Sequence, residues 1–253
     1  MLDVERRTKI LEILNKDGTV EVNKLAELFQ VTGATIRRDL RQLATEGMIQ
    51  RAHGGAVIKK GTLYEPSFEN SLESFTEEKE KIAKEAISYI NPGDAIFLDS
   101  STTVLHIAKN LKSMSDITVL TNSVPIAYEL YKSTKKQLVI LGGMLRSETG
   151  TVVGPIAEKN IKEFKIDVAF LGISAINTNG EMTDPNIYEA TIKRTIIENS
   201  NTVIGVADHS KFGNESFTFV ASVTKLSTLI TDKATPINFI KMLQNNKVEV
   251  ISV

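Results

Sequence analysis

The sequence predicts an α/β protein with two domains, a small one of helices and a hairpin followed by a larger one of alternating strands and helices. Two patterns predict this division. Residues 1–58 hold three helical patterns and two short extended runs, whereas residues 78–253 alternate strand-like and helical segments around a mostly parallel sheet. Between them, residues 59–77 include Pro66 and several Ser and Asn without clear periodicity, which is typical of a linker.

Composition excludes several classes of protein. The chain of 253 residues has no cysteine, so disulfides and thiolate metal sites are excluded, and its three histidines are scattered, which disfavours a zinc site. No apolar run approaches the roughly 18–20 residues that span a bilayer, and charges occupy the N-terminal stretch where a signal peptide is apolar. We therefore expect a cytoplasmic protein with no metal, no cofactor and no membrane contact.

Charge is distributed unevenly along the chain. The net charge is −1, but residues 1–60 carry +3 and the remainder carries −4. A modestly basic N-terminal domain on a more acidic body is typical of a nucleic-acid-binding module joined to another domain.

The three helical patterns cover residues 4–16, 23–29 and 33–46. Asp17-Gly18 ends the first, and Thr32 is placed to cap the third. Residues 48–60 form two extended runs around a Gly54-Gly55 turn, which predicts a hairpin. The apolar residues expected to face the core of this domain are Ile10, Ile13, Leu14, Leu25, Leu28, Phe29, Ile36, Leu40 and Leu43.

The outward face of the third helix carries side chains of the types that pair with DNA bases. At about 100° per residue, Arg38, Arg41 and Gln42 lie opposite the buried stripe, while Asp39 falls near that stripe. Arg and Gln pair bidentately with guanine and adenine edges, and a hairpin tip can contact adjacent phosphates. The alternative is a solvated helix face, and His53 taken alone stays ambiguous. The expected DNA contacts are Thr32, Thr35, Arg37, Arg38, Arg41, Gln42, Arg51, His53 and Gly54.

A run of hydroxyls follows the first strand of the larger domain. Asp99 ends the strand, and Ser100, Ser101, Thr102 and Thr103 begin a helix. A helix N-terminus after a short polar loop binds anions through unpaired backbone N–H groups and the helix dipole. An ordinary helix cap explains the same residues equally well.

Other polar residues also follow strands, so they are expected to converge on one crevice at the carboxyl edge of the sheet. Glu189 and Lys193 share one helix face, and the alternative for this pair is a surface ion pair. The residues expected in the crevice, besides the hydroxyl run, are Asp99, Asn122, Gly142, Gly143, Ser174, Glu189, Lys193, Asp208 and Lys211.

The motifs together resemble one family. Residues 31–57, "VTGATIRRDLRQLATEGMIQRAHGGAV", resemble the DNA-binding heads of the DeoR family of bacterial repressors, with Thr32 in place of the usual Ser. The body motifs "DSSTT", "TNS", "LGG", "YEATIKR" and "ADHSKFG" resemble that family's sensor domain. The resemblance implies a winged helix-turn-helix and a sensor domain similar to the ribose-5-phosphate isomerase and acyl-CoA transferase folds.

The resemblance also implies a function. The family's usual effectors are phosphorylated sugars or related metabolites, with the phosphate on Ser101, Thr102 and Thr103. Asp99, Asn122, Glu189, Lys193, Asp208 and Lys211 would then line the sugar end. Ser101 replaces a glycine common in the family, which puts the phosphate geometry in doubt because glycine allows the closest backbone approach.

We therefore expect a repressor of a carbohydrate-catabolism operon that is released from operator DNA by a phosphorylated sugar. One alternative is an isomerase-like enzyme with an appended DNA-binding head and Glu189 as its base. Another is a DNA binder that responds to no ligand. Because one head buries little surface on DNA, we expect a homo-oligomer, a dimer or a tetramer, on paired half-sites.

Overall fold

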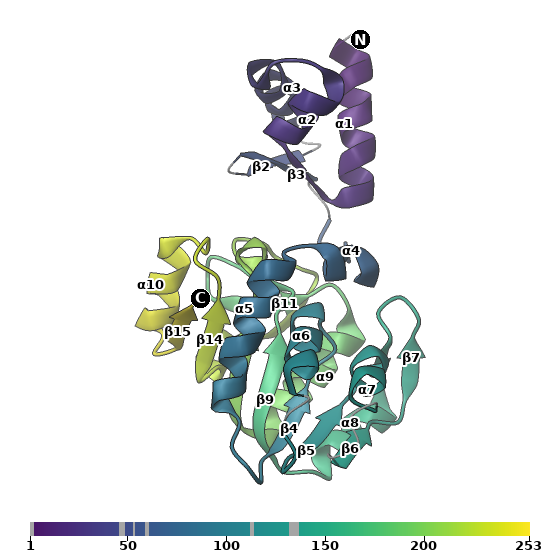
Figure 1. The fold of residues 1–253 in the computed structure, drawn as a ribbon, viewed down its shortest axis with the longest axis vertical. Coiled ribbons are helices and arrows are strands. Elements are labelled where there is room, and N and C mark those ends of the chain that lie inside the picture. Colours follow the sequence, from purple (N-terminus) through teal and green to yellow (C-terminus); the bar gives the residue numbers. More distant parts are fainter. Residues whose placement is uncertain (1–2, 46–48, 53, 59–60, 112–113, 132–136) are drawn as a thin grey trace. The chain divides into compact units, whose positions relative to one another are not determined.

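The computed structural model describes residues 3–45, 49–52, 54–58, 61–111, 114–131 and 137–253, without the side chains of 15–17, 50–52 and 57–58. These residues form two compact units, Met1–Pro66 and Ser67–Val253 (Figure 1). None of the described helices is long and apolar enough to cross a membrane.

The first unit contains three helices and a small antiparallel sheet. The helices are α1 (Asp3–Asp17), α2 (Val22–Phe29) and α3 (Gly33–Thr45), and the expected hairpin is β2 (Ile49–Ala52) with β3 (Gly55–Ile58). A third strand that the sequence did not predict, β1 (Thr19–Glu21), pairs with β3. A Cβ at Gly55 would lie 1.9 Å from the carbonyl oxygen of Val20, so only glycine lets β1 approach this closely.

The core of this unit follows the predicted helical stripes with one exception. Ile10, Leu14, Ile36 and their neighbours on α3 are buried. The expectation that Leu28 faces the core is wrong, because its side chain is 62% exposed. On the short helix α2 the inward side is defined by Val22, Leu25 and the partly buried Phe29, and Leu28 lies roughly 90° away from them at about 100° per residue.

The second unit is built on a seven-stranded, fully parallel sheet with strand order β15-β14-β12-β9-β4-β5-β6. This confirms the predicted α/β class. Its strands are β4 (Ala95–Leu98), β5 (Thr118–Thr121), β6 (Gln137–Ile140), β9 (Ile166–Gly172), β12 (Ser200–Val206), β14 (Thr228–Thr231) and β15 (Glu249–Ser252).

Helices cover both faces of this sheet (Figure 1). On one face, α5 (Thr76–Ala86), α6 (Thr102–Asn110) and α7 (Val124–Tyr131) share a core with Ile96 and Leu98. On the other, α8 (Pro155–Lys162), α9 (Ile187–Asn199) and α10 (Ile237–Asn245) share a core with Phe97. Successive residues of β4 thus point to opposite cores, which is why parallel strands buried on both faces read as continuous apolar runs.

Several short elements were not predicted. They are the hairpin of β7 (Met144–Arg146) and β8 (Thr151–Val153), the antiparallel sheet of β10 (Ala175–Ile176), β11 (Glu181–Asp184) and β13 (Thr218–Ser222), and the 3-10 helices Ile87–Tyr89, His209–Lys211 and Val223–Lys225.

The range 59–77, expected to be a linker, also contains ordered structure. Helix α4 (Phe68–Glu73) lies within it and α5 begins at Thr76, both in the second unit. Phe68 and Leu72 pack against the core beside α5 and α6, and this tertiary contact stabilises a helix too short to form by itself. The expectation of a linker extending to residue 77 is therefore corrected for residues 67–77.

Candidate functional site

Helix α3 presents a polar, basic face to solvent. The side chains of Arg37, Arg38, Arg41 and Gln42 are exposed. The helix begins after Thr32, whose hydroxyl accepts a hydrogen bond from the backbone N–H of Thr35 at 3.2 Å. This cap orders the first turn of α3, where Thr35 is half-buried.

Asp39, the one acidic residue among the arginines of α3, is turned away from that face. It is buried and accepts hydrogen bonds from Arg6 of α1, at 2.6 Å from Nε and 3.1 Å from Nη2. The hydrogen bond to Asp39 raises the pKa of Arg6. This ion pair joins α1 to α3 and neutralises a carboxylate that would otherwise repel phosphates.

The hairpin residues are only partly described. Gly54 is exposed at φ +81°, a conformation that favours glycine, and its carbonyl accepts a hydrogen bond from the N–H of Val22 at 2.9 Å. The backbone of Arg51 belongs to β2, but its side chain lies outside the described atoms, as does the whole of His53.

In the second unit, buried polar residues follow the carboxyl ends of neighbouring strands. Asp99 follows β4, Asn122 follows β5 and Asp208 lies beyond β12, all essentially inaccessible to solvent. Ser174, just beyond β9, is partly buried. The parallel arrangement of the strands brings these residues to one edge of the sheet, as expected for ligand sites in open α/β sheets.

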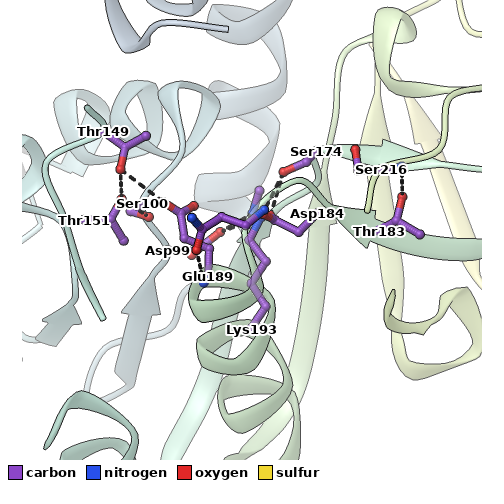
Figure 2. Close-up of polar contacts among 12 residues, drawn as sticks. Asp99, Ser100, Thr149, Thr151, Ser174, Thr183, Asp184, Glu189, Lys193 and Ser216 are labelled. Atoms are coloured by element: carbon purple, nitrogen blue, oxygen red, sulfur yellow. Dashed lines mark hydrogen bonds and ion pairs between the residues drawn. The ribbon is translucent and has the colours of Figure 1, made fainter. Parts of the chain in front are cut away.

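Lys193 of α9 is the centre of a buried charge cluster (Figure 2). Its Nζ lies 2.8 Å from Oδ2 of Asp184, 3.3 Å from Oγ of Ser174 and 3.9 Å from Oδ2 of Asp99. Burial alone would lower the pKa of Lys193, but Asp184, Asp99 and the nearby Glu189 outweigh it and raise that pKa. Lys193 is therefore a permanent cation at this edge.

The two carboxylates beside Lys193 have pKa values shifted in opposite directions. Burial raises the pKa of Asp99, and the charge of Lys193 only partly opposes this. Burial also acts to raise the pKa of Asp184, but Lys193, with the N–H of Asn186 and the hydroxyl of Ser174, lowers it overall. Lys193 thus pairs most strongly with Asp184. The charged form of Asp99 is less well stabilised.

Glu189 belongs to a second polar chain. It forms an ion pair with Arg146 and accepts a hydrogen bond from the hydroxyl of Thr149 at 3.0 Å. The hydroxyl of Thr149 also lies 2.8 Å from that of Thr151, and Thr151 donates to Ser100 at 2.9 Å (Figure 2). The alternative of a surface pair between Glu189 and Lys193 does not fit, because both side chains are buried and have other partners.

Three buried side-chain oxygens at the sheet edge have no hydrogen-bond partner within the described part of the chain: Oδ1 of Asp99, Oδ1 of Asn122 and Oδ2 of Asp208. Buried polar atoms are almost always paired, so an unpaired one calls for an explanation. All three accept and none donates, and they fit a ligand that carries several hydroxyl groups.

Three residues of the hydroxyl run lie at the start of α6, one as its cap and two in its first turn. Ser101 is the helix cap, and its Oγ accepts a hydrogen bond from the N–H of Val104 at 3.1 Å. Thr102 and Thr103 are buried in the first turn. A Cβ on Gly172 would lie 2.1 Å from Oγ of Ser101, so a glycine on β9 leaves the space that Ser101 occupies.

Other residues that were expected in the crevice make contacts outside the cluster around Lys193. The N–H of Gly142 donates to Oδ1 of Asn160 at 3.1 Å, and Gly142 and Gly143 are exposed. Asp208 accepts from the N–H of Ser210 at 3.0 Å and from its hydroxyl, and Asp208 and Lys211 influence the pKa of Lys79.

The sequence did not single out Asp184, Arg146, Thr149, Thr151 or Lys79. The first four lie on or beside the short antiparallel strands, which carry no periodic signal strong enough to place them. Lys79 is one of several charged residues in the sequence of a polar helix, so the sequence does not distinguish it from the others.

Comparisons with known proteins agree with this architecture. Residues 6–62 match the DeoR-like helix-turn-helix domain, and residues 74–233 match the DeoR C terminal sensor domain. The chain is 37% identical to YulB, an uncharacterised helix-turn-helix transcriptional regulator of Bacillus subtilis (strain 168), over 100% of this chain and 98% of that protein. It is 33% identical to the glycerol-3-phosphate regulon repressor of Escherichia coli (strain K12), over 98% of each.

Among solved structures, the chain is similar to a ribose 5-phosphate isomerase A from Methanocaldococcus jannaschii, with a TM-score of 0.42, 19% identity and 55% of each chain covered. Likeness at this level carries no information about chemistry.

Proposed function

Because the chain belongs to the DeoR family of transcriptional regulators, we propose that it represses a carbohydrate-catabolism operon and is released from its operator by a phosphorylated sugar. Residues 1–58 would bind DNA and residues 78–253 the sugar. The observation that carries the effector proposal is the set of three buried oxygens, of Asp99, Asn122 and Asp208, that lack a hydrogen-bond partner among the described residues at the carboxyl edge of the sheet.

The site suits the two halves of such a ligand. The unpartnered oxygens would accept hydrogen bonds from sugar hydroxyls, which are donors. The N-terminus of α6, with Thr102 and Thr103 in its first turn, would hold the phosphate through backbone N–H groups and the helix dipole. Because the hydroxyl of Ser101 already caps the helix, we assign the phosphate to the two threonines and the backbone.

The DNA contacts are proposed for the exposed face of α3. Arg38, Arg41 and Gln42 would read base edges, while Arg37 and the hairpin would contact phosphates. The buried pair of Arg6 with Asp39 supports this assignment, because it leaves the outward face of α3 without a negative charge.

We also propose that the protein is not an enzyme, that it acts as a homo-oligomer and that it works in the cytoplasm, where bacterial operator DNA lies. The carboxylate of Glu189, the candidate base of an isomerase, is held in an ion pair with Arg146, which disfavours proton abstraction. The names of its relatives support a regulatory role, since two of them are a glycerol-3-phosphate regulon repressor and the repressor GlcR.

Operator release tests the proposal. The purified full chain would first select its preferred sites from random-sequence DNA, and its affinity for them would be measured with and without glycerol 3-phosphate, glucose 6-phosphate and other sugar phosphates. We expect at least one to weaken operator binding by about 5–150-fold, the usual range of allosteric coupling. The matching free sugars are the control.

An operator affinity that no phosphorylated compound changes would contradict the effector proposal. Turnover of ribose 5-phosphate or another sugar phosphate by the same preparation would contradict the assignment as a non-enzyme.

A further inference from the structure

Helix α4 is the first element of the second unit, and the chain that arrives from the DNA-binding unit enters it directly through residues 61–66. Ser67 caps α4 by accepting a hydrogen bond from the N–H of Asn70 at 3.2 Å. The helix ends at Glu73, and α5 starts three residues later at Thr76. Helix α4 is therefore the element of the second unit that lies nearest to the DNA-binding unit along the chain.

The end of α4 is held by a buried lysine. Lys79 of α5 is 2% exposed, and its Nζ donates to the carbonyl oxygen of Ser74 at 2.7 Å and to that of Ser71. We call these two contacts the α4 latch. They satisfy carbonyl groups that a helix C-terminus leaves without intrahelical partners.

The latch holds an ammonium group that has no direct counter-ion among the described residues. Within the described part of the chain, Lys79 forms hydrogen bonds only to carbonyl oxygens and no ion pair. Burial lowers the pKa of Lys79 to about 8, with Asp208 opposing the shift and Lys211 adding to it. An anion arriving nearby would therefore interact strongly with Lys79.

The latch shares groups with the effector site. The carbonyl oxygen of Ser71 also accepts a hydrogen bond from the hydroxyl of Thr102 at 3.5 Å. Asp208, whose Oδ2 has no hydrogen-bond partner among the described residues, is the acidic residue that most raises the pKa of Lys79. A sugar phosphate that engages Thr102 and Asp208 thus competes with α4 for the hydroxyl of Thr102, and it changes the charge that Asp208 presents to Lys79.

A strained residue next to the latch allows a second arrangement. Phe75 adopts φ 54° and ψ 39°, a left-handed conformation that is costly for a residue with a side chain. Its ring packs edge-on against His209 at 4.8 Å between centroids, and His209 is hydrogen-bonded to Asp232 at 3.0 Å. The strain is kept only while the surrounding contacts hold the turn.

We propose that Lys79 is a positioning residue that couples effector binding to the DNA-binding unit by holding α4 through the α4 latch. This rests on the proposed function. The closed latch is the operator-binding arrangement, and a sugar phosphate at Thr102 and Asp208 opens it. Lys79 itself touches neither DNA nor the sugar.

The test compares Lys79→Met with Lys81→Met in the full chain. Lys81 is an exposed lysine on the same helix, so its variant controls for the loss of one charge from α5. Without any ligand, we expect Lys79→Met to bind selected operator DNA about tenfold more weakly than the control. We also expect glucose 6-phosphate or glycerol 3-phosphate to change the operator affinity of Lys79→Met by no more than about twofold.

Two further measurements separate coupling from stability. Backbone amide hydrogen exchange at Ser71 and Ser74 should accelerate in Lys79→Met, while stabilisation by the sugar phosphate in thermal denaturation should persist. If Lys79→Met does not fold, Lys79→Gln replaces it, because glutamine removes the charge and shortens the side chain but keeps a polar group at this buried position. Lys79→Gln should weaken operator binding in the same direction.

Operator affinity and α4 exchange equal to those of Lys81→Met would overturn the proposal. These readouts need no ligand, so they judge the latch even if the wild-type chain responds to no sugar phosphate, a result that would contradict only the effector proposal. A variant that melts at a lower temperature but keeps the wild-type ratio of operator affinities with and without sugar phosphate would show that Lys79 is purely structural.

Discussion

At the scale of single residues, burial decides which charges act. Arg6 and Lys193 are buried cations that face carboxylates, whereas Lys79 is a buried cation that faces carbonyl groups. The first two therefore keep their charge firmly, while the pKa of Lys79 is lowered to about 8 by burial. The arginines of α3 remain exposed and free to meet another molecule's phosphates or bases.

The exposed guanidinium of Arg38 leads to a prediction about specificity. We expect Arg38→Ala to cost about 1–3 kcal/mol on selected operator DNA and much less on random DNA, as for a bidentate base contact. Competition binding on both DNAs measures this difference. Lys24→Ala, at an exposed lysine of α2 paired with Glu21, is the control. An equal loss on the two DNAs would show that Arg38 contacts only phosphates.

The pair of His209 and Asp232 predicts a dependence of stability on pH. The hydrogen bond that the protonated ring of His209 donates to Asp232 raises the pKa of His209 above 6.5. Burial acts to raise the pKa of Asp232, but the hydrogen bonds from His209 and from the N–H of Ala234 lower it below 3.8 overall.

The signs of these shifts define a pH window. The histidine's contribution to stability is complete below its unfolded pKa of about 6.5 and is lost as pH rises through the higher folded value. The acid's contribution is lost as pH falls through its lowered value. The excess stability of the wild type over His209→Gln should therefore be largest from about pH 4 to 6.5, as chemical denaturation would measure. An excess that is constant from pH 4 to 9 would contradict this assignment.

At the scale of elements, close backbone approaches place the binding groups. Glycine at residue 172 of β9 leaves the space in which Ser101 caps α6, and glycine at residue 55 lets β1 join β3. Neither requirement is visible as a periodic pattern, because each depends on a neighbour that is distant in sequence.

The contact between Gly172 and Ser101 predicts the effect of one methyl group. We expect Gly172→Ala to destabilise the second unit by about 1–3 kcal/mol, because the added Cβ forces Ser101 and the first turn of α6 to move. Sugar-phosphate binding should weaken as well. Gly61→Ala is the matched control, since a Cβ there meets nothing within 4 Å. Denaturant titration measures the free energy of unfolding. Unchanged values in both variants would show that the first turn of α6 moves without an energetic cost.

At the scale of the whole molecule, the chain combines a small DNA-binding unit with a much larger sensor unit. One helix-turn-helix recognises only a short half-site, so useful specificity calls for two or more copies. We expect light scattering to find a dimer or a tetramer, and nuclease footprints on selected operators to show two half-sites separated by whole helical turns. A monomer that protects a single half-site would contradict this expectation.

The helices and strands with a regular apolar pattern were predictable from the sequence. The strands of the large sheet are continuous apolar runs and α3 has a clear buried stripe, so the α/β class, the outward Arg38 and the residues at the strand ends followed from local patterns. The small antiparallel sheet, α4 and the exposure of Leu28 did not, because tertiary packing stabilises short elements and chooses between adjacent apolar residues.

The sequence by itself determined that the chain has a basic helical head and a parallel α/β body with polar residues at the ends of its strands. Only the tertiary structure decided which of those residues meet. It paired Lys193 with Asp184, Glu189 with Arg146 and Lys79 with the end of α4. The physical reason is that hydrogen bonds and ion pairs depend on distances across the fold, whereas sequence periodicity reports only which face of an element is buried.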